Sequence, residues 1–413
     1  MSSHENRFAR SRALFERATH VIPGGIYGHM SPAVALPGEF PYYAERAEGS
    51  HYWDVDGNEY IDYLCGYGPM VLGHQHPEVE EAAGRQQRQA LCLNHPSAVM
   101  VDLAEHLVSL IDFSAWAVFG KNGSDMTTWA VQVAREHTQR RKILKVAGAY
   151  HGIDPWCTPG HGGLLPEDRA HVLEFHWNDL ESFEQLRRCH RDDIAGVIMT
   201  PFHHPAFKPS QMPAEGFWAH IESACRQDGI VLILDDIRAG FRLNLRGSHR
   251  FFGFEPDLIC LCKAIANGHA LSAALGRAEL RVAASKVFLT GSYWNSTPAM
   301  AAALACLKIL ERENVVTTLA HQGQKLLGGL VAAGRRHGYA VSPSGPPALP
   351  FISIGEDPSL RRQQRFCAEM ARRGALLHPH HNWFMSAAHS TQDVTVTLTW
   401  ADESFAALRA LNV

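Results

Sequence analysis

Six short segments beyond residue 70 are apolar almost from end to end, and helical patterns separate them. They span residues 115–120, 142–146, 195–200, 229–235, 257–262 and 270–276. A strand with one solvent-exposed face alternates apolar and polar side chains, whereas a strand covered on both faces is apolar throughout. The pattern therefore predicts an α/β domain built on a largely parallel sheet.

The two ends of the chain follow other patterns. An amphipathic helix is expected over residues 4–20, and "HYWDVDGNEYIDY" at 51–63 predicts a β-hairpin. Beyond the turn-rich stretch 342–350, an apolar strand, a helix and the β-branched run "VTVTLTW" at 394–400 are typical of a smaller α+β unit. We expect three parts, namely an N-terminal segment 1–65, a large domain 66–315 and a C-terminal small domain 316–413.

Composition excludes several classes of function. The chain has 413 residues, of which 46% are hydrophobic and 19% charged, and a formal net charge of −4, so we expect no nucleic-acid or membrane partner. It has no run of about 18 apolar residues and no apolar signal-peptide core near its N-terminus. Nine cysteines without a Cys-x-x-Cys pair favour a reduced, cytoplasmic setting. The histidine-rich "HPHHN" at 378–382 lacks a carboxylate or cysteine companion, so no metal site is predicted.

The stretch "NGSDM" at 122–126 leads from a predicted strand into a helix. Ser124 is a candidate N-cap of that helix, and free backbone N–H groups gather there with the positive end of the helix dipole. Gly123 and Ser124 lead into this helix, and such a helix start suits a phosphate group. The alternative is a helix that is simply capped.

Two further predicted strands end on ionisable residues. The run "VLILDD" ends on Asp235 and Asp236, and "ICLC" is followed by Lys263. The alternative for the aspartates is a structural role, in which they cap or stabilise a turn. For the lysine the alternative is a solvated position flanking its strand, which is common for lysines at strand ends. The thirteen residues after Lys263 are uncharged, however, and a desolvated lysine has the lowered pKa that suits a Schiff base. A phosphate cradle, an acid and this lysine together match the groups of pyridoxal phosphate.

The motifs, in their order along the chain, resemble the class III aminotransferases of the fold-type-I pyridoxal-phosphate enzymes, and in particular the glutamate-1-semialdehyde aminomutase-like branch. The resemblance covers nearly the whole chain. It is carried by "IPGG" at 22, "YWDVDGNEYIDY" at 52, "GHQHPEV" at 73, "NGSDM" at 122, "YHG" at 150, "LDDIRAGFR" at 234, "PDLICLCKAIANG" at 256 and "FMSAAH" at 384.

The resemblance implies roles for individual residues. Lys263 would hold the cofactor as a Schiff base and move protons, and Asp235 would pair with the protonated pyridine nitrogen. Tyr150 would stack on the ring, with His151 also at the cofactor. The phosphate would bind at Gly123 and Ser124. In "GSYWNSTPAM" at 291–300, Ser292 matches a threonine that reaches the phosphate of the neighbouring subunit, which implies a homodimer with shared active sites.

Three departures from the family pattern concern the substrate. Thr200-Pro201 stands where members commonly carry Glu-Pro, no arginine follows Pro-Gly-Gly, and none lies in "HPHHNWF". Glutamate-1-semialdehyde is therefore not the expected substrate. Candidate pocket residues are Tyr27, His29, Thr200, Trp294 and His378. Aromatic side chains here suit a bulky or apolar substrate, although each is equally at home in a domain interface.

The leading hypothesis is an aminotransferase that moves an amino group between a non-standard amino acid or amine and a keto acid. One alternative is an isomerase of the same fold, either an aminomutase or a racemase, which needs no separate amino acceptor. Another alternative is a non-catalytic cofactor-binding protein, whose bound cofactor no amine would discharge.

Overall fold

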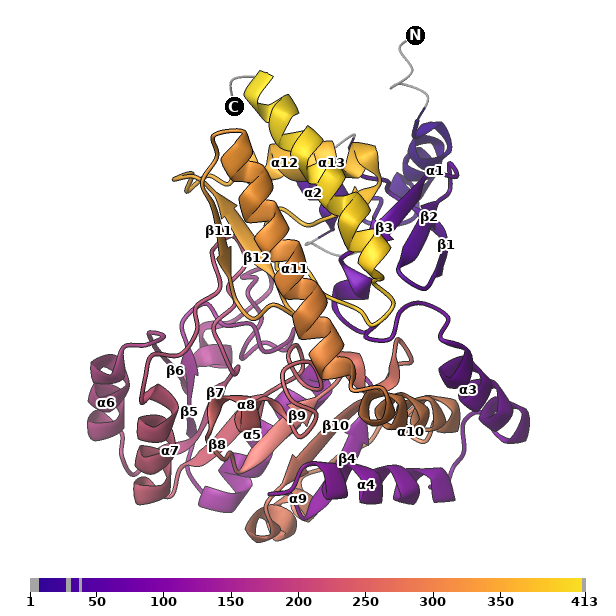
Figure 1. Ribbon diagram of the computed structural model, residues 1–413. Helices are drawn as coiled ribbons and strands as arrows, with labels where there is room; N and C mark the ends of the chain where they lie inside the picture. The colour runs from indigo at the N-terminus through magenta and orange to yellow at the C-terminus, as the bar shows by residue number, and fades with distance from the viewer. Residues whose placement is uncertain (1–6, 27–30, 37–38, 411–413) are drawn as a thin grey trace. The chain divides into compact units, whose positions relative to one another are not determined.

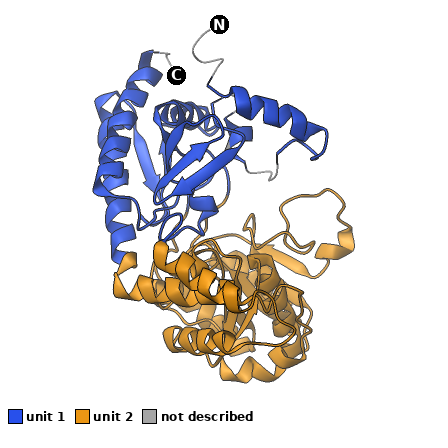
Figure 2. Ribbon diagram, turned by 90° about the vertical axis from the view of Figure 1, so that its right-hand side faces the viewer, with its two compact units in different colours: residues 1–76, 206–210, 317–413 blue, residues 77–205, 211–316 orange. Residues whose placement is uncertain are grey.

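The computed structural model describes residues 7–26, 31–36 and 39–410. The chain divides into two compact units (Figure 2). Unit 1 runs to His76 and adds 206–210 and the chain from Thr317 onward, whereas unit 2 consists of Pro77–Pro205 and Gln211–Val316. Each unit therefore combines segments that are distant in the sequence.

Unit 2 is built on a seven-stranded sheet in the order β4-β10-β9-β8-β7-β5-β6 (Figure 1). Its strands are β4 Trp116–Gly120, β5 Lys142–Val146, β6 Val172–Phe175, β7 Ile194–Met199, β8 Val231–Asp235, β9 Leu258–Leu261 and β10 Ser272–Gly276. Five strands are mutually parallel, and β10 is antiparallel to both of its neighbours. The predicted mostly parallel sheet and all six predicted strands are confirmed. The additional strand, β6, lies at the edge and carries an exposed glutamate, so the apolar criterion misses it.

Helices connect these strands. They are α3 Pro77–Gln89, α4 Ala98–Leu110, α5 Gly123–Thr138, α6 Leu180–Cys189, α7 Phe217–Asp228, α8 Ser248–Phe252, α9 Arg281–Lys286 and α10 Thr297–Arg312. Helix α5 buries Met126, Ala130, Val133 and Ala134, the apolar face that the sequence predicts, against side chains of β7, β8 and β9. Because this face is locked into the core, the start of α5 is held firmly at the sheet.

Unit 1 contains two smaller sheets. The first has the order β1-β2-β3-β13, and the second pairs β11 with β12. Their bounds are Ala44–Glu48, His51–Asp54, Glu59–Asp62 and Ala375–Leu376 for the first, and Val341–Ser344 and Phe351–Ile354 for the second. The predicted hairpin is confirmed as β2 and β3, with Gly57 N–H donating to the Asp54 carbonyl across the turn at 3.0 Å. Strand β11 takes the first residues of the predicted turn-rich break.

One helix of unit 1 lies where the sequence suggests a strand. The helices of this unit are α1 Ala9–Thr19, α2 Pro32–Ala35, α11 Val315–Arg336, which begins in unit 2, α12 Arg361–Arg373 and α13 Thr391–Ala410. The β-branched run at 394–400 suggests a strand, but it lies within α13. The buried side chains Val394, Thr397, Ala401 and Leu408 recur at helical spacing, so packing outweighs β propensity here.

Helices α11 and α13 have 22 and 20 residues and are the longest in the described parts of the chain. Both carry charged and polar side chains along their length. Over residues 7–26, 31–36 and 39–410, no helix combines the length and the apolar character that crossing a bilayer requires.

Candidate active site

Strand register brings Asp235 and Lys263 to the same end of the large sheet. Asp235, the last residue of β8, pairs with Cys260 of the parallel strand β9, and the N–H of Asp236 donates to the Cys260 carbonyl at 3.0 Å. Lys263 follows Cys260 by three residues and opens the short 3₁₀ helix Lys263–Ala266. Ligands of open α/β sheets bind at this carboxyl end of the strands. The two predicted residues therefore lie at the edge where such a site is expected.

The Asp235 carboxylate is buried and held from two sides. Its Oδ2 lies 2.8 Å from His151 Nδ1, and its Oδ1 accepts the Ile237 N–H at 3.2 Å. Among the described residues, His151 Nε2 is buried without a hydrogen-bond partner. We therefore assign the imidazole proton to Nδ1, which donates to the carboxylate. This arrangement fixes the carboxylate orientation while leaving it further acceptor capacity.

A second layer of contacts holds His151. Its ring lies parallel to that of Trp156, with centroids 6.4 Å apart and planes within 9°. The indole N–H of Trp156 donates to Thr128 Oγ1 at 2.8 Å, and Thr128 donates to Asp154 Oδ2 at 2.7 Å. The hydroxyl of Thr127 donates to the His151 carbonyl at 2.6 Å. The first turns of α5 thus support the histidine that holds Asp235.

Lys263 is half-buried, and its electrostatic surroundings favour the neutral amine. Desolvation lowers the pKa of Lys263 to about 8, and the charges of Arg238 and Arg242 act in the same direction. The negative charge of Asp235 opposes this change. A neutral amine is the form that attacks a carbonyl carbon, so the position suits the predicted chemistry.

The start of α5 differs from the sequence prediction in its cap. Asn122 is the N-cap, and Ser124 is the second residue of the helix. The reason is that Asp125 Oδ2 accepts the backbone N–H of both Lys121 and Asn122, at 2.9 and 2.8 Å, which fixes the first turn one residue before Gly123. Ser124 Oγ instead accepts the Ile153 N–H at 3.1 Å.

Two glycines allow three segments to converge at this helix start. A Cβ on Gly123 would lie 2.6 Å from Ile237 Cδ1, and one on Gly152 would lie 2.5 Å from Ser124 Oγ. Gly152 also has φ of +131°, which side chains disfavour. The α5 N-terminus therefore packs directly on the loop after Tyr150 and on the turn after β8.

These residues fit pyridoxal phosphate. A buried carboxylate, a desolvated amine and a helix N-terminus match its ring nitrogen, aldehyde and phosphate. The Tyr150 side chain, 46% exposed, offers a ring face beside His151, and burial of its hydroxyl raises the pKa of Tyr150. All of these groups belong to unit 2.

Other predicted residues of unit 2 lie in varied settings. Thr200 is buried just beyond β7, and its hydroxyl donates to the Phe202 carbonyl at 2.9 Å. Trp294 is half-buried in a turn where its backbone N–H donates to the Gly291 carbonyl at 3.0 Å. Ser292 is exposed, and its carbonyl accepts the Cys92 thiol at 3.1 Å. The hydroxyl of Thr200 thus serves its own loop.

The remaining candidate pocket residues lie elsewhere. His378 is buried in unit 1, where its Nδ1 accepts the His380 N–H at 2.9 Å and its carbonyl accepts the Trp383 indole N–H at 2.8 Å. These bonds organise the loop backbone. Tyr27 and His29 lie outside the described residues.

Sequence reasoning did not single out Arg238 or the support of His151 by Trp156. Arg238 has a local signal, because it is a charged residue in the otherwise apolar turn after Asp235 and Asp236. The Trp156 contact has no such signal, since it joins a loop to α5 through side chains that are distant in sequence.

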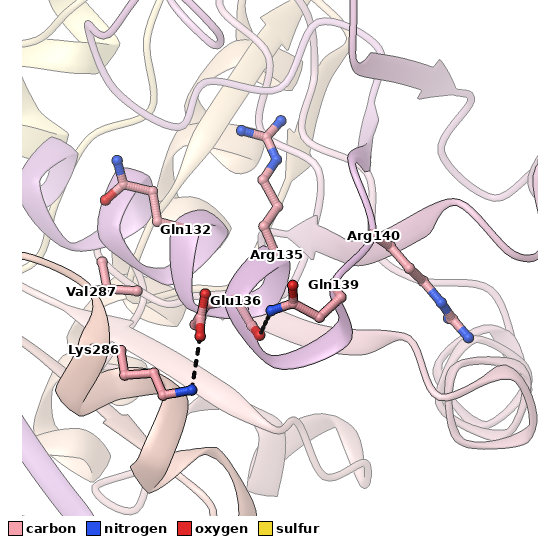
Figure 3. Close-up of a pocket in the computed structure, with 7 residues that line it drawn as sticks. All are labelled: Gln132, Arg135, Glu136, Gln139, Arg140, Lys286 and Val287. Atoms are coloured by element: carbon pink, nitrogen blue, oxygen red, sulfur yellow. Dashed lines mark hydrogen bonds and ion pairs between the residues drawn. The ribbon is translucent and has the colours of Figure 1, made fainter.

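Two surface hollows of about 410 Å³ are lined by residues of unit 2 that do not include Lys263. One is lined by residues that include Leu91, Lys121 and Tyr293. The other lies at the C-terminal end of α5 (Figure 3), whereas Gly123 begins this helix. In this second hollow Lys286 Nζ pairs with Glu136 at 3.2 Å, and Arg135 and Arg140 donate to backbone carbonyls.

Comparison with known proteins agrees with this geometry. The class III aminotransferase family model matches residues 35–403. An aminopentol aminotransferase of Sphingopyxis macrogoltabida is 43% identical, covering 97% of this chain and 94% of the relative. A 3-aminobutyryl-CoA aminotransferase of Cloacimonas acidaminovorans is 34% identical, covering 98% and 99%. The FumI protein of Sphingopyxis sp. MTA144, solved in its PLP internal aldimine form, superimposes with a TM-score of 0.95 at 43% identity, covering 97% and 96%. The chain therefore belongs to the class III aminotransferases of fold type I, and its cofactor is pyridoxal phosphate.

Proposed function

We propose that Lys263, Asp235 and the start of α5 carry out the transamination of an amine that is not a standard α-amino acid. The observation that carries this assignment is the register of β8 and β9, which sets Asp235 and Lys263 at neighbouring strand ends. Both named relatives act on donors outside the standard amino acids, an aminopentol and a 3-aminobutyryl-CoA. The amino acceptor would be a keto acid.

When bound, pyridoxal phosphate supplies an aldehyde that combines with amines and a ring that withdraws electrons from the carbon bearing the amino group. Lys263 would hold the aldehyde carbon and carry a proton to and from the donor carbon. Asp235, oriented by His151 Nδ1, would keep the ring nitrogen protonated. Gly123 and Ser124 would bind the phosphate, and Tyr150 would cover the ring.

We also propose that the enzyme works as a homodimer. Large apolar side chains are exposed in the segments that flank Ser292, since Phe288 is 84% and Tyr293 72% exposed. The neighbouring Leu91 is 56% exposed and lines a hollow with Tyr293. Burial of this patch by a second copy would remove apolar surface from water and let Ser292 reach the partner's phosphate site.

The proposal also covers the substrate-binding residues, the roles of the two units and the location of the protein in the cell. Trp294 would line the donor pocket, and Tyr27, His29, Thr200 and His378 remain candidates. Unit 2 would serve as the cofactor-binding domain and unit 1 as the small domain. All nine cysteines lie in the described residues and form no disulfide, which supports a cytoplasmic location.

A donor panel without any keto acid tests this function. The purified, cofactor-loaded protein is mixed with α-amino acids, β-amino acids and amines, and the visible absorbance of the bound cofactor is followed with product formation. A transaminase should consume one donor per site, yield one carbonyl product and then stop. Many turnovers to an isomer without acceptor would instead support the mutase or racemase.

A further inference from the structure

The loop that follows β7 is closed at its base within unit 2. His203 and Gln211 form an antiparallel bridge, in which the His203 N–H donates to the Gln211 carbonyl at 3.0 Å and the Gln211 N–H donates back at 2.7 Å. The His203 ring lies against that of Trp177, with centroids 5.9 Å apart and planes inclined by 22°. Asn178 Nδ2 donates to the Met212 carbonyl at 3.0 Å. Both ends of the loop are therefore fixed to unit 2.

The tip of the same loop, residues 206–210, belongs to unit 1 (Figure 2). The Phe207 N–H donates to the His380 carbonyl at 2.9 Å, and the rings of the two residues lie 4.7 Å apart with planes inclined by 31°. The Ser210 N–H donates to Ser344 Oγ at 3.1 Å. The tip is thus held by two hydrogen bonds and a ring contact.

Phe207 has an unusual backbone conformation. Its φ is +65°, in the left-handed region that bulky side chains rarely adopt. Such a conformation persists only where the surroundings hold it, and residues of this kind gather at functional positions. The side chain is 53% exposed, so burial of the ring does not explain the strain. The hydrogen bond and the ring contact with His380 therefore hold Phe207 in place.

His380 belongs to the histidine-rich stretch 378–382, which the cofactor-binding groups of unit 2 do not include. Its N–H donates to His378 Nδ1 at 2.9 Å, and the His378 carbonyl accepts the Trp383 indole N–H at 2.8 Å. Desolvation lowers the pKa of His380, so its ring is neutral at neutral pH and suited to an apolar partner. The stretch is therefore ordered by its own bonds and offers Phe207 both a carbonyl and a ring face.

The loop joins two segments that carry candidate pocket residues. Thr200 directly follows β7, which is parallel to β8, so it lies at the same edge of the sheet as Asp235. His378 lies two residues before His380, the partner of Phe207. A binding site works only where the surrounding structure fixes its residues. The contacts of Phe207 supply such a support, because neither segment can shift alone while they persist.

We propose that residues 204–210 form a strap, whose tip residue Phe207 is a positioning residue for the substrate side of the active centre. The strap ties the histidine-rich stretch 378–382 to the loop after β7. This inference rests on the proposed function, in which Thr200 and His378 are candidates for the donor pocket. Phe207 acts through these segments and makes no contact with the reacting atoms.

The test compares wild type with Phe207→Asn and Ser344→Ala. Asparagine adopts positive φ readily and keeps the backbone N–H, so Phe207→Asn removes the ring contact alone. Ser344→Ala removes the acceptor of the Ser210 N–H. Phe251→Asn is the matched control, because Phe251 is 51% exposed and its ring contacts the neighbouring Phe252.

Two quantities are measured after melting temperatures and cofactor absorbance have shown that each variant folds and binds the cofactor. The first is hydrogen exchange of the amides in 204–210 and 378–382, corrected for the intrinsic rate of each sequence. The second is the half-saturating donor concentration with pyruvate as acceptor. The donor probe is the member of the panel of amines and amino acids that discharges the wild type fastest.

Phe207→Asn should speed exchange in both segments about two- to tenfold, the factor by which an aromatic contact changes an equilibrium. The half-saturating donor concentration should rise by a similar factor. Turnover at saturating donor and the cofactor absorbance should stay near their wild-type values, because the proposed cofactor-binding groups lie in unit 2. Ser344→Ala should act in the same direction, and Phe251→Asn should match wild type.

The proposal is overturned if Phe207→Asn and Phe251→Asn show the same exchange in 378–382. It is also overturned if exchange rises there while the half-saturating donor concentration stays at its wild-type value. A joint fall of turnover and cofactor absorbance would indicate a general structural role and would count equally against it. Failure of the proposed function is separate, because it would appear as a wild-type protein that no donor discharges. The exchange measurement would then still decide whether Phe207 holds the histidine-rich stretch.

Discussion

His151 Nδ1 lies 2.8 Å from Asp235 Oδ2, and both side chains are almost completely buried. The other ring nitrogen of His151 is buried against Trp156 with no hydrogen-bond partner among the residues that the structure describes. The imidazole is therefore oriented for one task, to donate to this carboxylate. A buried carboxylate that lost such a donor would be costly, so the pair is a positioning device for Asp235.

Replacing His151 by Phe should weaken cofactor binding, because Asp235 then loses a charge-assisted hydrogen bond worth about 1.5 to 3 kcal/mol. We expect the dissociation constant for pyridoxal phosphate to rise about tenfold or more, measured by titrating the apoprotein. His220→Phe is the control, since His220 is more exposed and pairs with Glu184 on the surface. Equal affinities in the two variants would contradict the role of His151.

The two adjacent aspartates should respond differently to removal of charge. Asp235→Asn should reduce turnover by about a hundredfold, because a neutral amide stabilises a protonated ring nitrogen poorly. Asp236→Asn should retain most of the turnover, since an amide oxygen can still accept the Ser248 N–H that Asp236 Oδ2 accepts at 2.8 Å. Steady-state rates with saturating substrates provide the comparison, and near-normal rates in Asp235→Asn would refute its assignment.

Asp236 should also make the protein less stable as pH rises. Burial raises its pKa to about 7, so the folded state holds the proton more tightly than the unfolded state. Its contribution is most favourable below about pH 4 and is lost between about pH 4 and pH 7, by at most about 4 kcal/mol. Asp236→Asn should therefore gain stability relative to wild type as pH increases across this interval. Urea unfolding of the loaded proteins at several pH values measures the difference, which should not be constant.

The strands and the positions of the chemical groups were predictable because their causes are local. Continuous apolar runs follow from burial on both faces, and Asp235 and Lys263 stand out because each ends such a run. The helix start at Gly123 was likewise predictable, because small and polar residues at 122–125 precede the apolar face of α5.

The features that sequence reasoning missed depend on distant contacts. Asp125, rather than the candidate Ser124, organises the first turn of α5, and Ser124 is recruited by the Ile153 N–H from another loop. The run at 394–400 is helical because its buried side chains fit a helical face within unit 1. Local propensity also could not show that the turn after β8 packs on Gly123 through Ile237 and on Leu261 through Gly240.

Replacing Lys263 by Ala should abolish transamination, since no other amine would hold the cofactor aldehyde and move the proton. Loss of at least about a thousandfold in turnover is expected, together with loss of the visible absorbance that covalent attachment produces. Lys286→Ala is a suitable control, because Lys286 is exposed and pairs with Glu136 at the far end of α5. Substantial turnover by Lys263→Ala would refute the assignment.

The lowered pKa of Lys263 should be visible in the rate at which the apoprotein takes up pyridoxal phosphate. Only the neutral amine attacks the aldehyde, and desolvation brings the pKa of Lys263 to about 8 instead of its usual 10.5. Below about pH 8 the initial rate of attachment should therefore rise about tenfold per pH unit, and above it the rate should level off. Stopped-flow absorbance between about pH 6 and about pH 10 measures this profile, with a free lysine derivative as reference. A rate that keeps rising to about pH 10, as the reference should, would show that the Lys263 amine is not desolvated.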